Sequence, residues 1–199
     1  MQLIAITHTV PQVNEAAIIN QLFTAGLPRL HVRRPAATEI EIDQLLQQIE
    51  HVWHPQISLH SCHQLVHRYQ IGGLHYTEAM RAGSNATEWQ SCKSSGYTLS
   101  TSVHQLPLPA HLSGYFSYAF YGPVFNSISK PGYQQAISDN FYLEEVQKSI
   151  PLIALGGITA GNFSQVKAMN FDGAALLGSL WQQPAKAPQL IASLLSHCQ

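Results

Sequence analysis

Short apolar runs recur along the chain, and each has the length of one buried β-strand. They are rich in Ile, Leu, Val or Tyr and are separated by more polar segments. They lie at residues 3–7, 29–33, 57–60, 73–76, 97–102, 115–121, 151–155 and 172–178. This pattern predicts a protein with eight strands.

The segments between most of these runs have the spacing of amphipathic helices. Apolar residues gather on one face in residues 13–26 and again in residues 38–53. Thr38 and Glu41 fit a capping box at the start of the second segment. Further helices are predicted in residues 140–149, 162–170 and 187–198, whereas residues 78–96 are polar and rich in serine and give a weaker helical signal.

Strands that alternate with helices at this interval are typical of parallel strands joined by right-handed crossovers. Eight such repeats predict a closed α/β architecture, a (β/α)8 TIM barrel, with residues 1–199 forming a single domain. Because such barrels usually need about 250 residues, with a lower bound near 200, this one is expected to be compact. The alternative is an open doubly wound sheet, but no Gly-x-Gly-x-x-Gly follows the first strand.

The composition predicts that the protein binds a small molecule. Charged residues make up 11% of the chain and the net charge is -1, so no basic surface predicts nucleic-acid binding. No apolar stretch reaches the roughly 18 residues of a membrane span, and Met1 leads into an apolar run without a basic leader. These features predict a cytoplasmic protein. Cys62, Cys92 and Cys198 are widely spaced and odd in number, so reduced thiols are expected.

In a TIM barrel, the loops that follow the strands build the active site. Polar residues and glycines occupy these positions here: His8, Arg33, Arg34, His60, Ser61, Glu78, Ser102, His104, Gly156, Gly157, Gly178 and Ser179. Two glycine-containing stretches, after the seventh and eighth runs, lie where barrels commonly bind phosphate through backbone N–H groups. The simpler interpretation, in which both stretches are only turns, stays open at this stage.

Several motifs together resemble one enzyme family. In order along the chain they are "LHVRR", "SVH", "YGPVFNSISKPG", "PLIALGGIT" and "FDGAALLGSL". They are similar to the thiamine phosphate synthase and TenI family, and the similarity runs from Leu3 to about Leu180. The resemblance implies a compact (β/α)8 barrel that handles a thiazole phosphate.

The family has two activities, and the resemblance implies different residues for each. Synthases join a pyrimidine pyrophosphate to the thiazole phosphate and bind Mg²⁺ through two aspartates. The matching positions here hold Ser61 and Met80, neither of which is an anionic oxygen ligand. Glu78 as a displaced ligand stays an alternative, and Mg²⁺ is expected only if the chain is a synthase. Pro35 replaces the family lysine, for which Arg34 is a candidate substitute.

The resemblance is closer to the TenI branch, which implies a thiazole tautomerase that uses no metal or other cofactor. His104 matches the catalytic histidine, and a histidine suits proton transfer near neutral pH. The residues expected to bind the substrate are Arg33, Arg34, Ser102, Ser127, Ser129 and Lys130. The residues expected to bind its phosphate are Gly156, Gly157, Leu177, Gly178 and Ser179.

Less specific interpretations accompany this one. His104 as a packing residue, Lys130 as a solvated loop residue and a catalytically silent phosphate-binding barrel all stay open, as does pairing into a homodimer. His63 and His67 have the spacing of metal ligands on a helix, but the chain has 11 histidines and no carboxylate completes the set, so no metal site is expected. His31 and His75 lie inside strands and are expected to be partnered core histidines.

Overall fold

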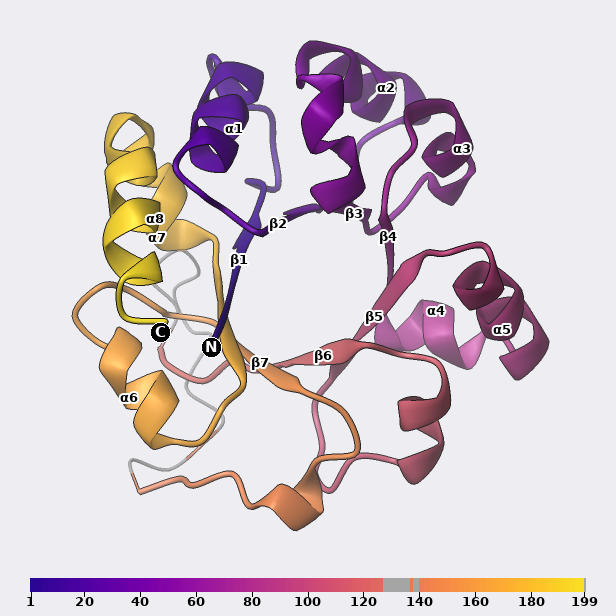
Figure 1. Ribbon diagram of the computed structural model, residues 1–199, viewed down its shortest axis with the longest axis vertical. Coiled ribbons are helices and arrows are strands. Elements are labelled where there is room, and N and C mark those ends of the chain that lie inside the picture. Colours follow the sequence, from indigo (N-terminus) through magenta and orange to yellow (C-terminus); the bar gives the residue numbers. More distant parts are fainter. Residues whose placement is uncertain (127–136, 138–139, 199) are drawn as a thin grey trace.

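The computed structural model describes residues 1–126, 137 and 140–198. Eight parallel strands follow one another around a closed barrel, which Figure 1 shows as a ring of strands with the helices outside it. The strands are β1 (Gln2–Ile6), β2 (Arg29–Val32), β3 (Ile57–Leu59), β4 (Gly73–Tyr76), β5 (Thr98–Val103), β6 (Tyr118–Tyr121), β7 (Leu152–Leu155) and β8 (Gly173–Leu176). The barrel closes where β1 pairs with β8, in a register that places Gln2 opposite Gly173. The predicted TIM barrel is therefore confirmed.

Helices cover the outside of the ring. They are α1 (Glu15–Thr24), α2 (Glu39–Gln48), α3 (Val66–Tyr69), α4 (Glu78–Ala82), α5 (Ala86–Ser94), α6 (Phe163–Ala168), α7 (Gly178–Trp181) and α8 (Ala187–Leu195). Short 3-10 helices lie at His51–Gln56, His63–Leu65, Ala110–Gly114, Glu145–Gln147 and Pro184–Lys186. Within the described residues, none of these helices combines the length and the apolar character needed to span a bilayer.

The polar segment 78–96 forms two helices because each has its own side-chain cap. Thr77 accepts a hydrogen bond from the backbone N–H of Met80 at the start of α4. The side chain of Asn85 accepts a hydrogen bond from the backbone N–H of Glu88 at the start of α5. Ser, Thr and Asn at these positions stabilise a helix start even where the helix itself is polar.

The prediction of a helix at residues 140–149 is wrong. This segment contains only the 3-10 turn Glu145–Gln147. The backbone N–H of Leu143 donates to the carbonyl of Met169 at 3.0 Å, and the ring of Phe141 stacks on that of Phe171. These long-range contacts hold the segment extended, so its apolar residues pack without helical spacing.

The interior of the barrel has two different halves. Side chains from β1, β6, β7 and β8 form an apolar cluster. Its members are Ile4, Ile6, Tyr118, Phe120, Ile153 and Ala175. The same inward positions on β2 to β5 carry polar groups, which are His31, Ser58, His75 and Ser100, each with 0% exposure. The alternating Leu and Ile residues of these strands face the helices instead.

Candidate functional site at the carboxyl ends of the strands

His104 lies at the rim of the barrel, directly after β5. Its Nδ1 is 3.2 Å from the carbonyl oxygen of Gly122, which follows β6. Because a carbonyl only accepts, Nδ1 is the donor in this contact, which leaves Nε2 as the ring nitrogen that can take up a proton. The side chain of His104 is 54% exposed, so a small molecule has access to the ring.

Glu78, at the start of α4, brings a carboxylate to the same place. Its Oε2 is 3.9 Å from Nε2 of His104, and its Oε1 is 3.9 Å from a guanidinium nitrogen of Arg81. Arg81 in turn donates to the backbone carbonyl of Ser102 at 2.7 Å. Residues that follow β4, β5 and β6 therefore meet around His104, as expected for the site end of a TIM barrel.

The two arginines after β2 have different surroundings. The backbone N–H of Arg33 donates to Oγ1 of Thr7 at 2.9 Å, and the positive charge of Arg33 acts on His60 and His75 in the interior. Arg34 instead forms an ion pair with Glu15 at the start of α1, and both side chains are buried. Arg33 thus lies beside the polar half of the interior, whereas the guanidinium of Arg34 is engaged within the fold.

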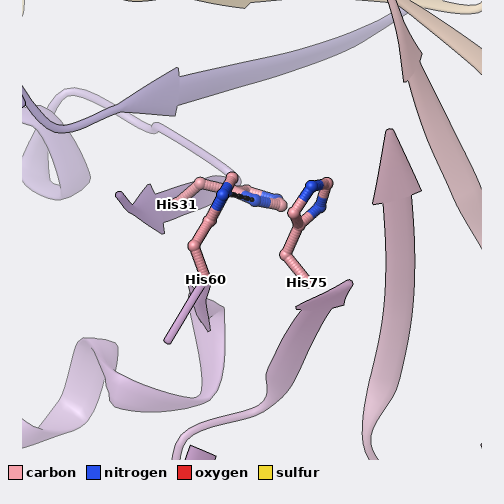
Figure 2. Close-up of side chains that lie close together, drawn as sticks. All are labelled: His31, His60 and His75. Atoms are coloured by element: carbon pink, nitrogen blue, oxygen red, sulfur yellow. Dashed lines mark hydrogen bonds between the residues drawn. The ribbon is translucent and has the colours of Figure 1, made fainter. Parts of the chain in front are cut away.

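Three imidazoles meet in the polar half of the interior. Nδ1 of His31 and Nε2 of His60 are 2.9 Å apart, and Figure 2 shows these two rings joined by that contact, with His75 beside them. The rings of His60 and His75 stack with centroids 3.9 Å apart. We call His31, His60 and His75 the histidine cluster.

Hydroxyl groups surround the histidine cluster. The phenol oxygen of Tyr118 is 2.6 Å from Nε2 of His31. Ser102, which was predicted to bind substrate, places its Oγ 2.9 Å from Nε2 of His75, and Oγ of Ser100 is 3.0 Å from Nδ1 of the same ring. Ser102 therefore connects the rim to the cluster.

The histidines of the cluster are uncharged at neutral pH. Burial is the main cause that lowers the pKa of each ring, and it lowers the pKa of His75 to about 3. Nearby cationic groups, which include Arg33 for His60 and His75, are a smaller cause of the same lowered pKa values.

The glycine pair after β7 is required by the packing of its neighbours. Gly156 and Gly157 have φ values of 104° and 64°, which favour glycine. A Cβ on Gly157 would lie 2.4 Å from the carbonyl oxygen of Asn126 and 2.7 Å from Cβ of Phe125. The pair therefore allows the loop after β6 to approach closely, and this requirement holds whether or not a phosphate binds here.

The segment after β8 has groups that are free to bind an anion. Leu177, Gly178 and Ser179 lie at the start of α7, which has no side-chain cap. Backbone N–H groups at such a position lack partners within the helix. Oγ of Ser179 is buried and has no hydrogen-bond partner in the described part of the chain. Ser127, Ser129 and Lys130 lie outside the described residues.

The sequence contains a pattern that indicates the histidine cluster, although its three histidines were not among the predicted site residues. The dipeptide Leu-His occurs in three consecutive strand regions, as Leu30-His31, Leu59-His60 and Leu74-His75. Since side chains alternate across a strand, each leucine faces the helices and each histidine faces the interior. Convergence of the three rings also depends on strand register, which the spacing alone does not define.

A family profile described as thiamine monophosphate synthase matches residues 3–180. The crystal structure of thiamine phosphate pyrophosphorylase from Bacteroides thetaiotaomicron is similar, with a TM-score of 0.73 and 25% identity over 98% of this chain and 96% of that chain. The thiamine phosphate pyrophosphorylase of Pyrococcus furiosus shares the fold, with a TM-score of 0.70 and 14% identity over 98% and 94%. A search of curated proteins found no match.

Proposed function

Because the chain belongs to the thiamine monophosphate synthase family, which acts in thiamine biosynthesis, we propose that it is a TenI-like thiazole tautomerase. It would convert a carboxythiazole phosphate into its aromatic isomer by moving a proton. The observation that carries this proposal is the combination of an accessible imidazole at the rim with the loss of both carboxylates that a synthase needs. His104 supplies the imidazole, and Ser61 and Met80 replace the carboxylates.

The residues present do not fit the magnesium ion of a synthase. Mg²⁺ prefers carboxylate oxygen ligands, but Ser61 offers a neutral hydroxyl and Met80 a thioether. The carboxylate of Glu78 lies beside His104 and Arg81 and is 57% exposed. We therefore assign no step of the reaction to a bound magnesium ion.

His104 is the proposed acid and base. Its Nε2 takes a proton from a ring carbon of the substrate, and the imidazolium then returns a proton at the second position, so that the numbers of protons and electrons are unchanged. The carboxylate of Glu78, 3.9 Å from Nε2, stabilises the imidazolium between the two steps. Proton transfer by a positioned histidine typically contributes a factor of about 10² to 10⁴.

Binding of the two anionic groups is assigned to different loops of the rim, which follow β2 for the carboxylate and β7 and β8 for the phosphate. Arg33 would contact the substrate carboxylate, with Ser102 close by, and Arg34 would stabilise the fold through Glu15. The backbone N–H groups of Gly157, Leu177 and Gly178 would bind the phosphate, as at other helix starts and tight turns. Ser127, Ser129 and Lys130 stay predicted substrate contacts, with Gly156 and Ser179 in the phosphate site.

A two-substrate assay tests the function. The purified protein is given the carboxythiazole phosphate alone in the presence of EDTA, and the aromatic product is followed by absorbance and mass. We expect turnover under these conditions, and we expect His104→Asn to lower it at least about 100-fold because no other group is assigned the proton transfer. His67→Asn, on α3, is the control because its ring contacts Tyr97 on the outer surface.

The same assay distinguishes the alternatives. A synthase would make thiamine phosphate from the aromatic thiazole phosphate and the pyrimidine pyrophosphate only with Mg²⁺. A catalytically silent barrel would bind the thiazole phosphate without turnover in either reaction. An unchanged rate in a folded His104→Asn variant would exclude His104 as the catalyst.

A further inference from the structure

The histidine cluster has no assigned part in the proposed proton transfer, yet it occupies the centre of the polar half of the barrel. One nitrogen from each of His31, His60 and His75 lies within 4.8 Å of the other two. The rings come from β2, from the end of β3 and from β4, and Figure 2 shows them directed toward one another. His31 and His75 have 0% exposure and His60 has 8%, so all three are buried and His60 is the least buried.

Packing alone does not explain three imidazoles at these positions. The opposite half of the same interior is filled by Ile4, Ile6 and Ile153, which need no polar partners. Burying a polar ring costs free energy unless its nitrogens are bonded, so three adjacent imidazoles need a set of polar partners here, which the other rings, Tyr118, Ser100 and Ser102 supply. A ligand that binds all three would account for them.

We propose that the histidine cluster binds one divalent transition-metal ion of the zinc type, with a fourth coordination position open. Imidazole nitrogens are preferred ligands of Zn²⁺ and its neighbours, whereas Mg²⁺ and Ca²⁺ prefer oxygen. Three histidines with one open position are a known ligand set for zinc. The inference does not rest on the proposed tautomerase activity.

The distances fit after small side-chain movements. With nitrogen ligands about 2.05 Å from a tetrahedral ion, the ligand nitrogens lie about 3.3 Å apart. Nδ1 of His31 and Nε2 of His60 are now 2.9 Å apart, as a hydrogen-bonded pair. Binding would separate them slightly and draw one nitrogen of His75 inward, out of its stacked position on His60.

The surrounding hydroxyls match the outer contacts of metal-binding histidines. A ligating imidazole usually donates its second N–H to a hydrogen-bond acceptor, which fixes the orientation of the ring. The phenol oxygen of Tyr118 is in this position for Nε2 of His31. Ser100 and Ser102 each contact one nitrogen of His75. When one of these nitrogens binds the ion, its serine loses that contact, and the other serine stays bonded to the second nitrogen.

The charges nearby favour an anion as the fourth ligand. The described residues place no carboxylate among the three rings, and Arg33 lies close enough for its charge to act on His60 and His75. A dication held by neutral rings beside an arginine needs negative charge for balance, which hydroxide or a ligand carboxylate would supply.

Cobalt substitution tests the site without an activity assay. The full-length protein is dialysed against a chelator and titrated with Co²⁺ at pH 7.5, and zinc affinity is measured by competition. We expect visible absorption bands of four- or five-coordinate cobalt that saturate at one equivalent. His60→Gln and His75→Gln should each weaken binding more than about 100-fold, and Tyr118→Phe about 10- to 100-fold.

His67→Gln is the matched control because it removes an imidazole from the surface. It should leave the stoichiometry and affinity unchanged. A second measurement does not depend on the folding of any variant: in NMR of the imidazole nitrogens of the wild-type protein, one equivalent of Zn²⁺ should shift the signals of three histidines. Absent cobalt bands, bands that survive in a folded His60→Gln variant, or unshifted imidazole signals would each overturn the proposal in favour of a metal-free hydrogen-bonded cluster.

Discussion

At the residue scale, Arg33 and Arg34 are adjacent in the sequence, but their side chains have different surroundings and therefore different roles. Arg33 lies beside the polar interior, whereas Arg34 pairs with Glu15 in a buried contact. Burial raises the pKa of Glu15, and the positive charge of Arg34 opposes this effect. Oε1 of Glu15 and Nε of Arg34 have no hydrogen-bond partner in the described residues, so the pair depends on a single contact.

Removal of one partner should destabilise the fold strongly. Arg34→Met leaves the buried carboxylate of Glu15 unpaired, and we expect the free energy of unfolding to fall by about 3–5 kcal/mol. The double variant Glu15→Gln with Arg34→Met should recover most of this loss because no buried charge remains. Urea unfolding of the wild type, the single variants Glu15→Gln and Arg34→Met, and the double variant measures the coupling. Additive losses would show that the two side chains do not interact.

At the element scale, the start of a helix can be predicted from residues close together in the sequence, because its capping contacts are local. The predicted capping box of α2 is confirmed. Oγ1 of Thr38 accepts from the backbone N–H of Glu41 at 3.3 Å, and the carboxylate of Glu41 accepts from the backbone N–H of Thr38 at 2.7 Å. Thr24, in the last turn of α1, donates instead to the carbonyl of Asn20 and caps nothing.

Thr38→Ala should therefore lower the free energy of unfolding by about 1 kcal/mol, within a range of 0.5–2. Thr24→Ala is the control, and we expect it to change stability by less than about 0.5 kcal/mol. Thermal unfolding of both variants at pH 7 makes the comparison. Equal losses in the two variants would exclude a specific role for the cap.

The pH dependence gives a second measure of the same cap. Hydrogen bonds from the backbone and side chain of Thr38 lower the pKa of Glu41 from 4.5. A carboxyl group whose pKa is lower in the folded state stabilises the fold above its unfolded pKa, and this contribution is lost as the pH falls through the folded value. The difference in Tm between the wild type and Thr38→Ala should therefore shrink below pH 4.5.

At the scale of the whole molecule, the barrel depends on close contact where its first and last strands meet. A Cβ on Gly173 of β8 would lie 2.5 Å from the backbone carbonyl oxygen of Gln2 and 2.7 Å from Cδ1 of Ile153. The side chain of Trp181 also spans this region, because its Nε1 donates to the carbonyl of Ile6 at 2.8 Å. Closure therefore requires a residue without a side chain at position 173.

Gly173→Ala should open this contact and cost about 1–3 kcal/mol or more, as expected for overpacking against the backbone. Gly114→Ala is the matched control, since a Cβ there meets no atom within 4 Å. Urea unfolding compares the two variants, and hydrogen exchange should show faster exchange in β1 and β8 of Gly173→Ala. A loss no larger than that of Gly114→Ala would contradict the tight contact.

Much of the fold could be predicted because its signals are local. A buried strand needs a run of apolar residues, so all eight strands were found within a few residues of their observed ends. The segment 140–149 could not be predicted, because its extended path is held by Met169 and Phe171, which come much later in the chain. For the candidate site, His104 could be placed at the rim because it directly follows a strand.

The sequence by itself determined the closed alternation of strands and helices, the family, and the residue types available after each strand. Only the tertiary structure decided which of these residues meet. Arg34 turned toward Glu15, and His31, His60 and His75 converged inside the barrel. The physical reason is that the order of strands and helices depends on local periodicity, whereas contacts across a barrel depend on strand register and on the direction of each side chain, which form only when the barrel closes.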